Sequence, residues 1–262
     1  MKNIIVIKIG GSTLGSGDTT IEDVVALQKQ GKSLVVIHGG GKDVTEWLKR
    51  QGIATRFVRG ERVTDKPALE VATAVLSGLI NKEITAAINV RGGQAAGMSG
   101  VDGALVETRI ENPDMGYVGV VAKVNPAVLE ALLQAGFMPI ISPISLYSMD
   151  RPEEAPPLVN VNGDPVAGDI AAALKAQRLI YLTDVPGIAD AAGKVLSRLS
   201  VSEAQSLITS GVIAGGMIPK VNACIRAVKA GAVARIVDGR KPHALFNEIE
   251  NPVGGTTLYN NK

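Results

Sequence analysis

Cysteine is nearly absent from the sequence, because Cys224 is the only one in 262 residues. A single thiol cannot form an internal disulfide, and zinc sites built on paired cysteines are excluded as well. Cys224 lies in an apolar helical pattern, which indicates a buried structural thiol. The sequence is therefore unlike that of a disulfide-rich secreted domain, and by default we expect a cytoplasmic protein.

Aromatic residues are also scarce, at 3% of the chain, so few side chains could stack on nucleic-acid bases. The net charge is +2 and no long basic run occurs, which argues against nucleic acids and membranes as partners. No apolar run approaches the length of a membrane span, and the short start before the first apolar run is unlike a signal peptide. The 46% of hydrophobic residues instead predicts a substantial core, in one large domain or two joined lobes.

The first apolar stretch, residues 4–9, predicts a strand that is buried on both faces. Lys8 stands near its end, and because an ammonium is rarely buried alone we expect Lys8 to face an anion. Gly10 and Gly11 follow, and glycines let the backbone approach a ligand closely. By itself this segment fits a plain strand-to-helix turn equally well, since it lacks the glycine spacing of dinucleotide-binding and Walker loops.

A second glycine segment follows the next predicted strand. Thr20 begins a capping box with Asp23, which predicts a helix, and residues 34–37 predict another buried strand. Strand, helix and strand indicate a parallel βαβ unit with both glycine segments at one edge of the sheet. The triple glycine at 39–41 has an entropic penalty that a bound ligand would explain. His38, which closes the strand, is given a structural and not a catalytic role.

Two further basic residues stand where an anion could bind. Arg62 lies between a predicted hairpin at residues 55–63 and the start of the next helix, where its forked guanidinium could clamp a carboxylate. Lys220 lies just inside a predicted helix, near its positive end. A cation is unfavourable there unless an anion binds at the same helix end.

Polar residues gather again before a helix in the middle of the chain. Asn160 and Asn162 alternate with valines, so their amides share one face of a strand end. Asp164 follows, directly before Pro165, and could be a functional carboxylate or simply the cap of the next helix. The sequence leaves both alternatives open.

The rest of the chain continues the alternation of strands and helices. A capping box at Ser200 and Glu203 predicts the start of one helix. Further strands are predicted at residues 95–98, 117–124, 138–142, 179–183, 232–237 and 256–259.

Taken together, six short motifs in sequence order resemble the amino acid kinase superfamily. Within it the chain is most similar to the N-acetylglutamate kinase family of arginine biosynthesis, from near Ile4 to Leu258. The motifs are Lys8-Ile9-Gly10-Gly11, His38-Gly39-Gly40-Gly41, Arg62-Val63-Thr64, Asn160-Val161-Asn162-Gly163-Asp164, Thr183-Asp184-Val185-Pro186-Gly187 and Gly215-Gly216-Met217-Ile218-Pro219-Lys220.

The resemblance implies one amino acid kinase domain over residues 1–262, an α/β three-layer αβα sandwich around a mainly parallel sheet. An N-terminal lobe of about residues 1–176 would bind the acyl amino acid, and a C-terminal lobe of about 177–262 would bind ATP. The implied reaction is phosphorylation of the γ-carboxylate of N-acetyl-L-glutamate by ATP. Mg²⁺ would be held mainly by the nucleotide phosphates, so no protein metal ligand is expected.

The resemblance also implies residue roles. Lys8 and Lys220 would stabilise the transferring phosphoryl group, and Asp164 would hold both lysines in place. N-acetyl-L-glutamate would be bound by Gly40, Gly41, Arg62 and Asn160, with Arg62 on its α-carboxylate. ATP would be bound by Gly10, Gly11, Thr183, Asp184, Val185, Pro186, Gly187, Ile188, Val212, Ile213 and Ala214.

Two departures keep alternatives open. Lys42 stands where many relatives have proline, and Gly163 before Asp164 is similar to kinases whose glutamate or aminoadipate is linked to an amino-group carrier protein. A catalytically silent nucleotide-binding sensor is less favoured, because Lys8, Asp164 and Lys220 are all present. Since Met1 lies only three residues before the first strand, we expect a homodimer without the N-terminal helix of arginine-inhibited hexamers, and no inhibition by arginine.

Overall fold

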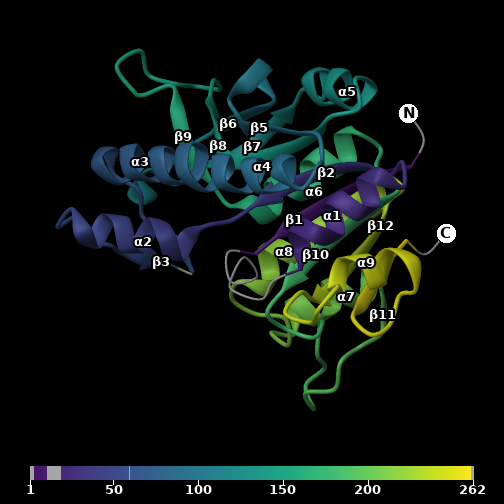
Figure 1. Ribbon diagram of the computed structural model, residues 1–262. Helices are drawn as coiled ribbons and strands as arrows, with labels where there is room; N and C mark the ends of the chain where they lie inside the picture. The colour runs from purple at the N-terminus through teal and green to yellow at the C-terminus, as the bar shows by residue number, and fades with distance from the viewer. Residues whose placement is uncertain (1–2, 11–18, 59, 261–262) are drawn as a thin grey trace.

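The computed structural model describes residues 3–10, 19–58 and 60–260. In these residues one sheet of eleven strands runs in the order β11-β13-β12-β10-β1-β2-β8-β6-β7-β9, with β5 paired to β8. Most neighbouring strands are parallel, and helices lie on both faces of the sheet (Figure 1). The expected αβα sandwich around a mainly parallel sheet is therefore confirmed.

The strands are β1 Ile4–Ile9, β2 Ser33–His38, β3 Phe57–Val58, β4 Glu61–Arg62, β5 Ala95–Gly100, β6 Val106–Arg109, β7 Val118–Val124, β8 Met138–Tyr147, β9 Leu158–Val161, β10 Arg178–Thr183, β11 Arg198–Ser200, β12 Val233–Asp238 and β13 Thr256–Tyr259. The α-helices are α1 Thr20–Lys29, α2 Gly41–Arg50, α3 Lys66–Thr73, α4 Asn81–Val90, α5 Ala127–Gln134, α6 Gly163–Ala173, α7 Val201–Thr209, α8 Met217–Lys229 and α9 Ala244–Glu250. A π-helix, η1 Ala74–Ile80, joins α3 to α4, and η2 Asp102–Ala104 and η3 Pro113–Met115 are short 3₁₀ turns.

The central strand β1 is parallel to both of its neighbours, β2 and β10. Ile5 and Ile7 pack into the core beneath α1, α3 and α9, whereas Ile4 and Val6 pack into the core beneath α6 and α8. Because side chains alternate along a strand, Lys8 emerges on the same face as Val6. The predicted βαβ unit is confirmed, and it places Lys8 below α6 and α8.

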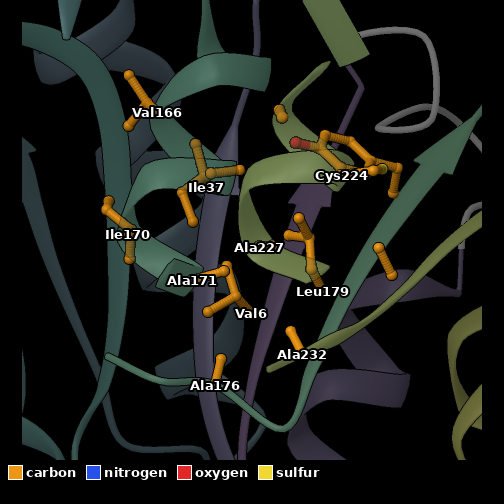
Figure 2. Close-up of a cluster of buried hydrophobic side chains, with 14 of the residues drawn as sticks. Val6, Ile37, Val166, Ile170, Ala171, Ala176, Leu179, Cys224, Ala227 and Ala232 are labelled. Carbon is orange, nitrogen blue, oxygen red and sulfur yellow. The ribbon is translucent and has the colours of Figure 1, made fainter. Parts of the chain in front are cut away.

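Helices α6 and α8 pack closely over this second core. Figure 2 shows Val6 and Ile37 of the strands in one cluster with Ile170 of α6 and Ala227 of α8. The crossing depends on a small residue, since a Cβ at Gly168 would lie only 2.7 Å from the Cβ of Ala223. This contact brings the first turns of the two helices to the same end of the sheet.

The helical run Lys66–Val90 joins α3, η1 and α4 into 25 residues that are long and apolar enough, by length and composition alone, to cross a membrane. This run differs from the expectation that no apolar run approaches the length of a membrane span. Val71, Ile84 and Ile88 of this helix are buried in the core shared with α1 and β2. We therefore attribute its apolar character to packing against the sheet.

The structure corrects one predicted cap and several strand boundaries. Thr20 is not the cap of α1, because Thr19 holds that position without a side-chain hydrogen bond. The predicted capping box of Ser200 and Glu203 is confirmed. Strand β8 continues to Tyr147 instead of ending at residue 142, and β6 and β11 were not predicted.

Asp23, expected to form a capping box with Thr20, instead joins α1 to α9. Its carboxylate lies 2.7 Å from Nδ1 of His243 and also accepts a hydrogen bond from the amide of Phe246. This hydrogen bond raises the pKa of His243 above its ordinary value of 6.5.

Because the pKa of His243 is raised in the folded state, the direction in which pH changes the stability of the protein is known. The stability that the pair contributes is fully present below pH 6.5 and is lost as the pH rises through the higher folded-state pKa. We expect a small effect, because more than half of the His243 side chain is exposed. Thermal unfolding from pH 6 to 9 should show this loss in the wild type and not in His243→Asn. Equal pH dependence in both proteins would contradict it.

Candidate functional site

Two cavities meet at the carboxyl end of β1. The first, here the hairpin cavity, has a volume of 260 Å³ and is lined by Lys8, residues 39–41, Arg62 and Asn160, among others. The second, here the lysine cavity, has a volume of 370 Å³ and is lined by Lys8, Lys220 and residues 182–185, among others. Lys8 lines both, so its ammonium marks their junction. Ligands at this edge of a parallel sheet are common, because strand ends and helix N-termini meet there.

A single carboxylate joins the two lysines at that junction. Oδ1 of Asp164 lies 2.7 Å from Nζ of Lys8, and Oδ2 lies 2.7 Å from Nζ of Lys220. All three side chains are nearly buried. Burial alone would raise the pKa of Asp164, but the two ammonium groups outweigh burial and hold that pKa below its ordinary value. Asp164 is therefore ionised, and it aligns two cations that would otherwise repel each other.

Asp164 is free for this contact because another residue caps its helix. Asn162 is the N-cap of α6, and its Oδ1 accepts a hydrogen bond from the amide of Asp164. The alternative that Asp164 merely caps the helix is therefore wrong. Tyr181 supports the same turn from β10, because its hydroxyl donates to the backbone carbonyl of Asp164 at 2.7 Å.

Lys220 lies in the first turn of α8, as predicted, with its ammonium 4.7 Å from the ring centroid of Tyr181. Burial lowers the pKa of Lys220, and Asp164 only partly opposes this effect. Cys224, one turn later, is fully buried, and burial raises the pKa of its thiol. The expected structural role of this cysteine agrees with that environment.

Arg62 reaches from the hairpin to the N-terminus of α2. Its Nη2 donates to the carbonyl of Gly41 at 2.8 Å and to Oγ1 of Thr45 at 2.7 Å, and its guanidinium lies over the ring of Phe57. Its Nη1 is buried and has no hydrogen-bond partner among the described residues. A buried donor of this kind favours an anion in the adjoining cavity.

The glycine segment forms the opposite wall of the hairpin cavity. Gly40 has φ of +152°, and a Cβ there would collide with Ile80 and Leu76 of η1. Gly41 begins α2, whose N-terminal amides lack intrahelical acceptors and favour negative charge. Asn160 lines the same cavity, with its Nδ2 3.3 Å from Oγ1 of Thr64.

Behind the glycine segment lies a polar network that the sequence analysis did not find. His38 is fully buried, with Nδ1 2.8 Å from the carbonyl of Gly39 and Nε2 3.2 Å from Nδ2 of Asn81. Burial lowers the pKa of His38 to about 4, so its imidazole is neutral and structural. Asn81 also donates to the carbonyl of Ile140 in β8. The signal was present, since Asn81 is a polar residue in an otherwise apolar helical stripe.

The residues predicted to bind ATP do not all come together. Gly10, Thr183, Asp184 and Val185 line the lysine cavity. Gly11 lies outside the described residues.

The remaining predicted ATP residues are not among those that line either cavity. Pro186 lines a separate hollow beside α9, and Gly187 is packed against Thr256. Ile188 is buried and its amide donates to Oγ1 of Thr256. The segment 212–214 lines neither cavity, and Ile213 at its centre is buried.

Within residues 3–10, 19–58 and 60–260, no three His, Cys, Asp or Glu side chains are grouped as metal ligands would be. The carboxylate of Asp164, which contacts both lysines that line the lysine cavity, is already bound by two ammonium groups. The described residues therefore do not form a carboxylate cage for a hard cation.

Comparisons with known proteins agree with this architecture. A model of the amino acid kinase family matches residues 3–238. An acetylglutamate kinase of Dehalococcoides mccartyi is 48% identical over 256 residues, which are 98% of this chain and 94% of that protein. An acetylglutamate kinase of Methanothrix thermoacetophila is 44% identical, over 99% of this chain and 93% of that protein.

Solved structures show the same fold. N-acetylglutamate synthase from Neisseria gonorrhoeae, complexed with coenzyme A and N-acetyl-glutamate, superposes with a TM-score of 0.83 at 27% identity. The match covers 99% of this chain and 60% of that one. Giardia carbamate kinase superposes with a TM-score of 0.72 at 18% identity, over 99% of both chains, and shows the fold alone.

Proposed function

The chain belongs to the amino acid kinase family, and from this premise we propose that it phosphorylates the γ-carboxylate of N-acetyl-L-glutamate with ATP, in arginine biosynthesis. The observation that carries the proposal is the junction of two cavities at Lys8, with Lys220 held beside it by Asp164. Phosphoryl transfer between two anions needs positioning and charge neutralisation more than covalent chemistry. Acetylglutamate kinases with 43–48% identity over nearly the whole chain support the choice of substrate.

In this proposal the hairpin cavity holds the acyl amino acid. The unpartnered Nη1 of Arg62 binds the α-carboxylate, and Asn160 contributes a polar contact from β9. Gly40 and Gly41 direct the γ-carboxylate toward Lys8, because their backbone can approach it without a Cβ. Lys8 then neutralises charge on the acceptor side of the transferring group.

ATP occupies the lysine cavity, with Lys220 beside its terminal phosphate and residues 183–185 along its other wall. Mg²⁺ would be held mainly by the nucleotide phosphates, where it would neutralise charge. The N-terminal lobe, about residues 1–176, thus serves the acyl amino acid, and the C-terminal lobe serves ATP. We further propose a homodimer in the cytoplasm.

Trapping with hydroxylamine tests the reaction directly, because an acyl phosphate gives a hydroxamate. We expect hydroxamate from N-acetyl-L-glutamate with Mg·ATP, and none from free glutamate. Product only from glutamate linked to a carrier protein would assign the chain to the alternative kinases. The structure does not require glycine at position 163, because a Cβ there would lie at an ordinary 3.6 Å from Cε of Lys8. Gly163 is therefore no argument for the carrier-linked kinases. Nucleotide binding without turnover would indicate a sensor.

Arg62→Lys tests the assignment of the hairpin cavity. Lysine keeps the positive charge but loses the forked geometry and the contacts with Gly41 and Thr45. We expect the KM for the acyl amino acid to rise by roughly tenfold or more, a loss of about 1.4 kcal/mol, with a much smaller change in the KM for ATP. Steady-state kinetics with each substrate varied in turn measures both values. An unchanged KM for the acyl amino acid would remove Arg62 from the site.

A further inference from the structure

The hairpin of β3 and β4 forms one wall of the cavity and projects two adjacent side chains in opposite directions. Glu61 and Arg62 are neighbours in β4, so they point to opposite faces of the strand. Arg62 contacts the N-terminus of α2, as described above. Glu61 also lines the hairpin cavity, and on the side of α6 its Oε1 accepts a hydrogen bond from Nδ2 of Asn162 at 3.2 Å. The hairpin therefore bridges the first turns of α2 and α6.

Asn162 uses both ends of its amide in this arrangement. Its Oδ1 accepts from the amide of Asp164 at 3.0 Å, while its Nδ2 donates to Glu61. A serine or aspartate could cap α6 equally well, but an aspartate has no donor, and the shorter serine has no second polar atom at the place of Nδ2. The amide thus does more than helix capping requires.

Two residues close in sequence extend this bridge to the proposed site. Glu61 adjoins Arg62, which lines the hairpin cavity and whose buried Nη1 has no partner among the described residues, and Asn162 lies two residues before Asp164, which holds Lys8 and Lys220. Arg56, beside the hairpin, contacts a different segment, since it donates to the carbonyl of Asp114. The hydrogen bond between Glu61 and Asn162 thus connects the wall of the hairpin cavity directly to α6, the helix that carries Asp164.

We propose that Glu61 and Asn162 are a pair of positioning residues that couples occupancy of the hairpin cavity to the alignment of Asp164 and its two lysines. An acyl amino acid that binds Arg62 restricts the motion of β4 and therefore of Glu61. Glu61 then holds Asn162, the cap of α6, in place. Binding of the acyl amino acid therefore strengthens ATP binding and turnover. The inference deepens the proposed function and rests on it.

Binding measurements test the coupling. The affinity for a non-hydrolysable ATP analogue with Mg²⁺ is measured with and without saturating N-acetyl-L-glutamate. We expect the wild type to gain affinity by a factor in the usual range of about 5–150. Asn162→Ser, which retains a cap, and Glu61→Ala should bring that factor close to one. Both should lower kcat by roughly tenfold to a hundredfold, since displaced catalytic groups are costly.

Two variants separate the hydrogen bond from other effects. Glu61→Gln keeps an oxygen that can accept from Asn162, so it should retain the coupling factor. Arg56→Ala loosens the hairpin without touching α6 and should retain it as well. Loss of coupling in Glu61→Gln, or in Arg56→Ala, would overturn the proposal. So would a wild type without coupling, or a thermal destabilisation of Asn162→Ser with its coupling intact.

Hydrogen exchange in the ligand-free protein distinguishes failure of this inference from failure of the proposed function. Amides of residues 57–62 should exchange faster in Asn162→Ser and Glu61→Ala than in the wild type or Glu61→Gln. Unchanged exchange would overturn the link, whatever the enzyme's activity. A wild type that phosphorylates no N-acetyl-L-glutamate would instead overturn the proposed function, while the exchange rates still decide whether the hairpin is tied to α6.

Discussion

Asp164→Asn is expected to lower kcat by about 10³, because one missing preorganised group costs ~10²–10³ and this change misplaces two lysines. The asparagine keeps the shape of the side chain but removes the charge between the two ammonium groups, each 2.7 Å from an oxygen of Asp164. Lys8 and Lys220 would then repel each other in a nearly buried site. Steady-state kinetics at saturating substrates measures the loss.

The same substitution should also destabilise the ligand-free protein. Breaking a buried ion pair by removing one partner costs ~3–5 kcal/mol, because the remaining charge is left uncompensated. The phosphates of ATP could supply the missing negative charge. We therefore expect Mg·ATP to raise the Tm of Asp164→Asn more than it raises the Tm of the wild type.

Asp169→Asn is a matched control on the same helix. Asp169 is paired with Arg226, about two-fifths of whose side chain is exposed, and lines neither the hairpin cavity nor the lysine cavity. Burial raises the pKa of Asp169 despite that arginine, which indicates a weak net interaction. We expect a loss of at most ~1 kcal/mol and near-normal kcat. Near-normal turnover in Asp164→Asn as well would remove Asp164 from catalysis.

The fold could be predicted because its central elements have strong local signals. Residues 4–9 and 34–37 are largely apolar runs of strand length with a glycine within two residues of their ends, and both belong to parallel strands in the sheet. The alternation of strands with capped helices then leaves few topologies. Short elements gave weaker signals, since β6 and β11 have only a few residues each and are mostly polar.

The choice between the two alternatives for Asp164 could not be made from the sequence. An Asp before a proline at the start of a helix is a good local cap, and only tertiary contacts show otherwise. The ammonium groups that bind the carboxylate come from β1 and α8, far along the chain in both directions. Asn162 was expected only to share a strand face with Asn160, yet it is the cap.

Buried ion pairs on other elements were missed for the same reason. Arg235 of β12 donates to both carboxylate oxygens of Glu248 in α9 and to the carbonyl of Gly254. Neither residue interrupts the pattern of its own element strongly enough to indicate a partner. Periodicity assigns a residue to a face, but it does not identify the side chain that meets it across the layers.

Lys220→Ala should lower kcat by ~10²–10³, roughly 3–4 kcal/mol, because Lys220 acts mainly on charge that develops at the transition state. Lys220 lines only the lysine cavity, so the KM for N-acetyl-L-glutamate should hardly change. Lys8 lines both cavities, and Lys8→Ala should therefore raise the KM values of both substrates as well as lowering kcat. Lys229→Ala, exposed on the same helix as Lys220, is the control and should keep its turnover.

The pH dependence of kcat is an independent test of the role of Lys220. Burial lowers the pKa of its ammonium below the ordinary 10.5, and the protonated form is the one that stabilises a phosphoryl group. The wild-type kcat should accordingly fall, as pH rises, at a pH below 10.5. Lys220→Arg, whose guanidinium stays protonated, should be slower but should keep its rate to higher pH. If the alkaline limbs of the wild type and Lys220→Arg coincide, the titrating group is not Lys220, and its assignment to the transferring phosphoryl group loses this support.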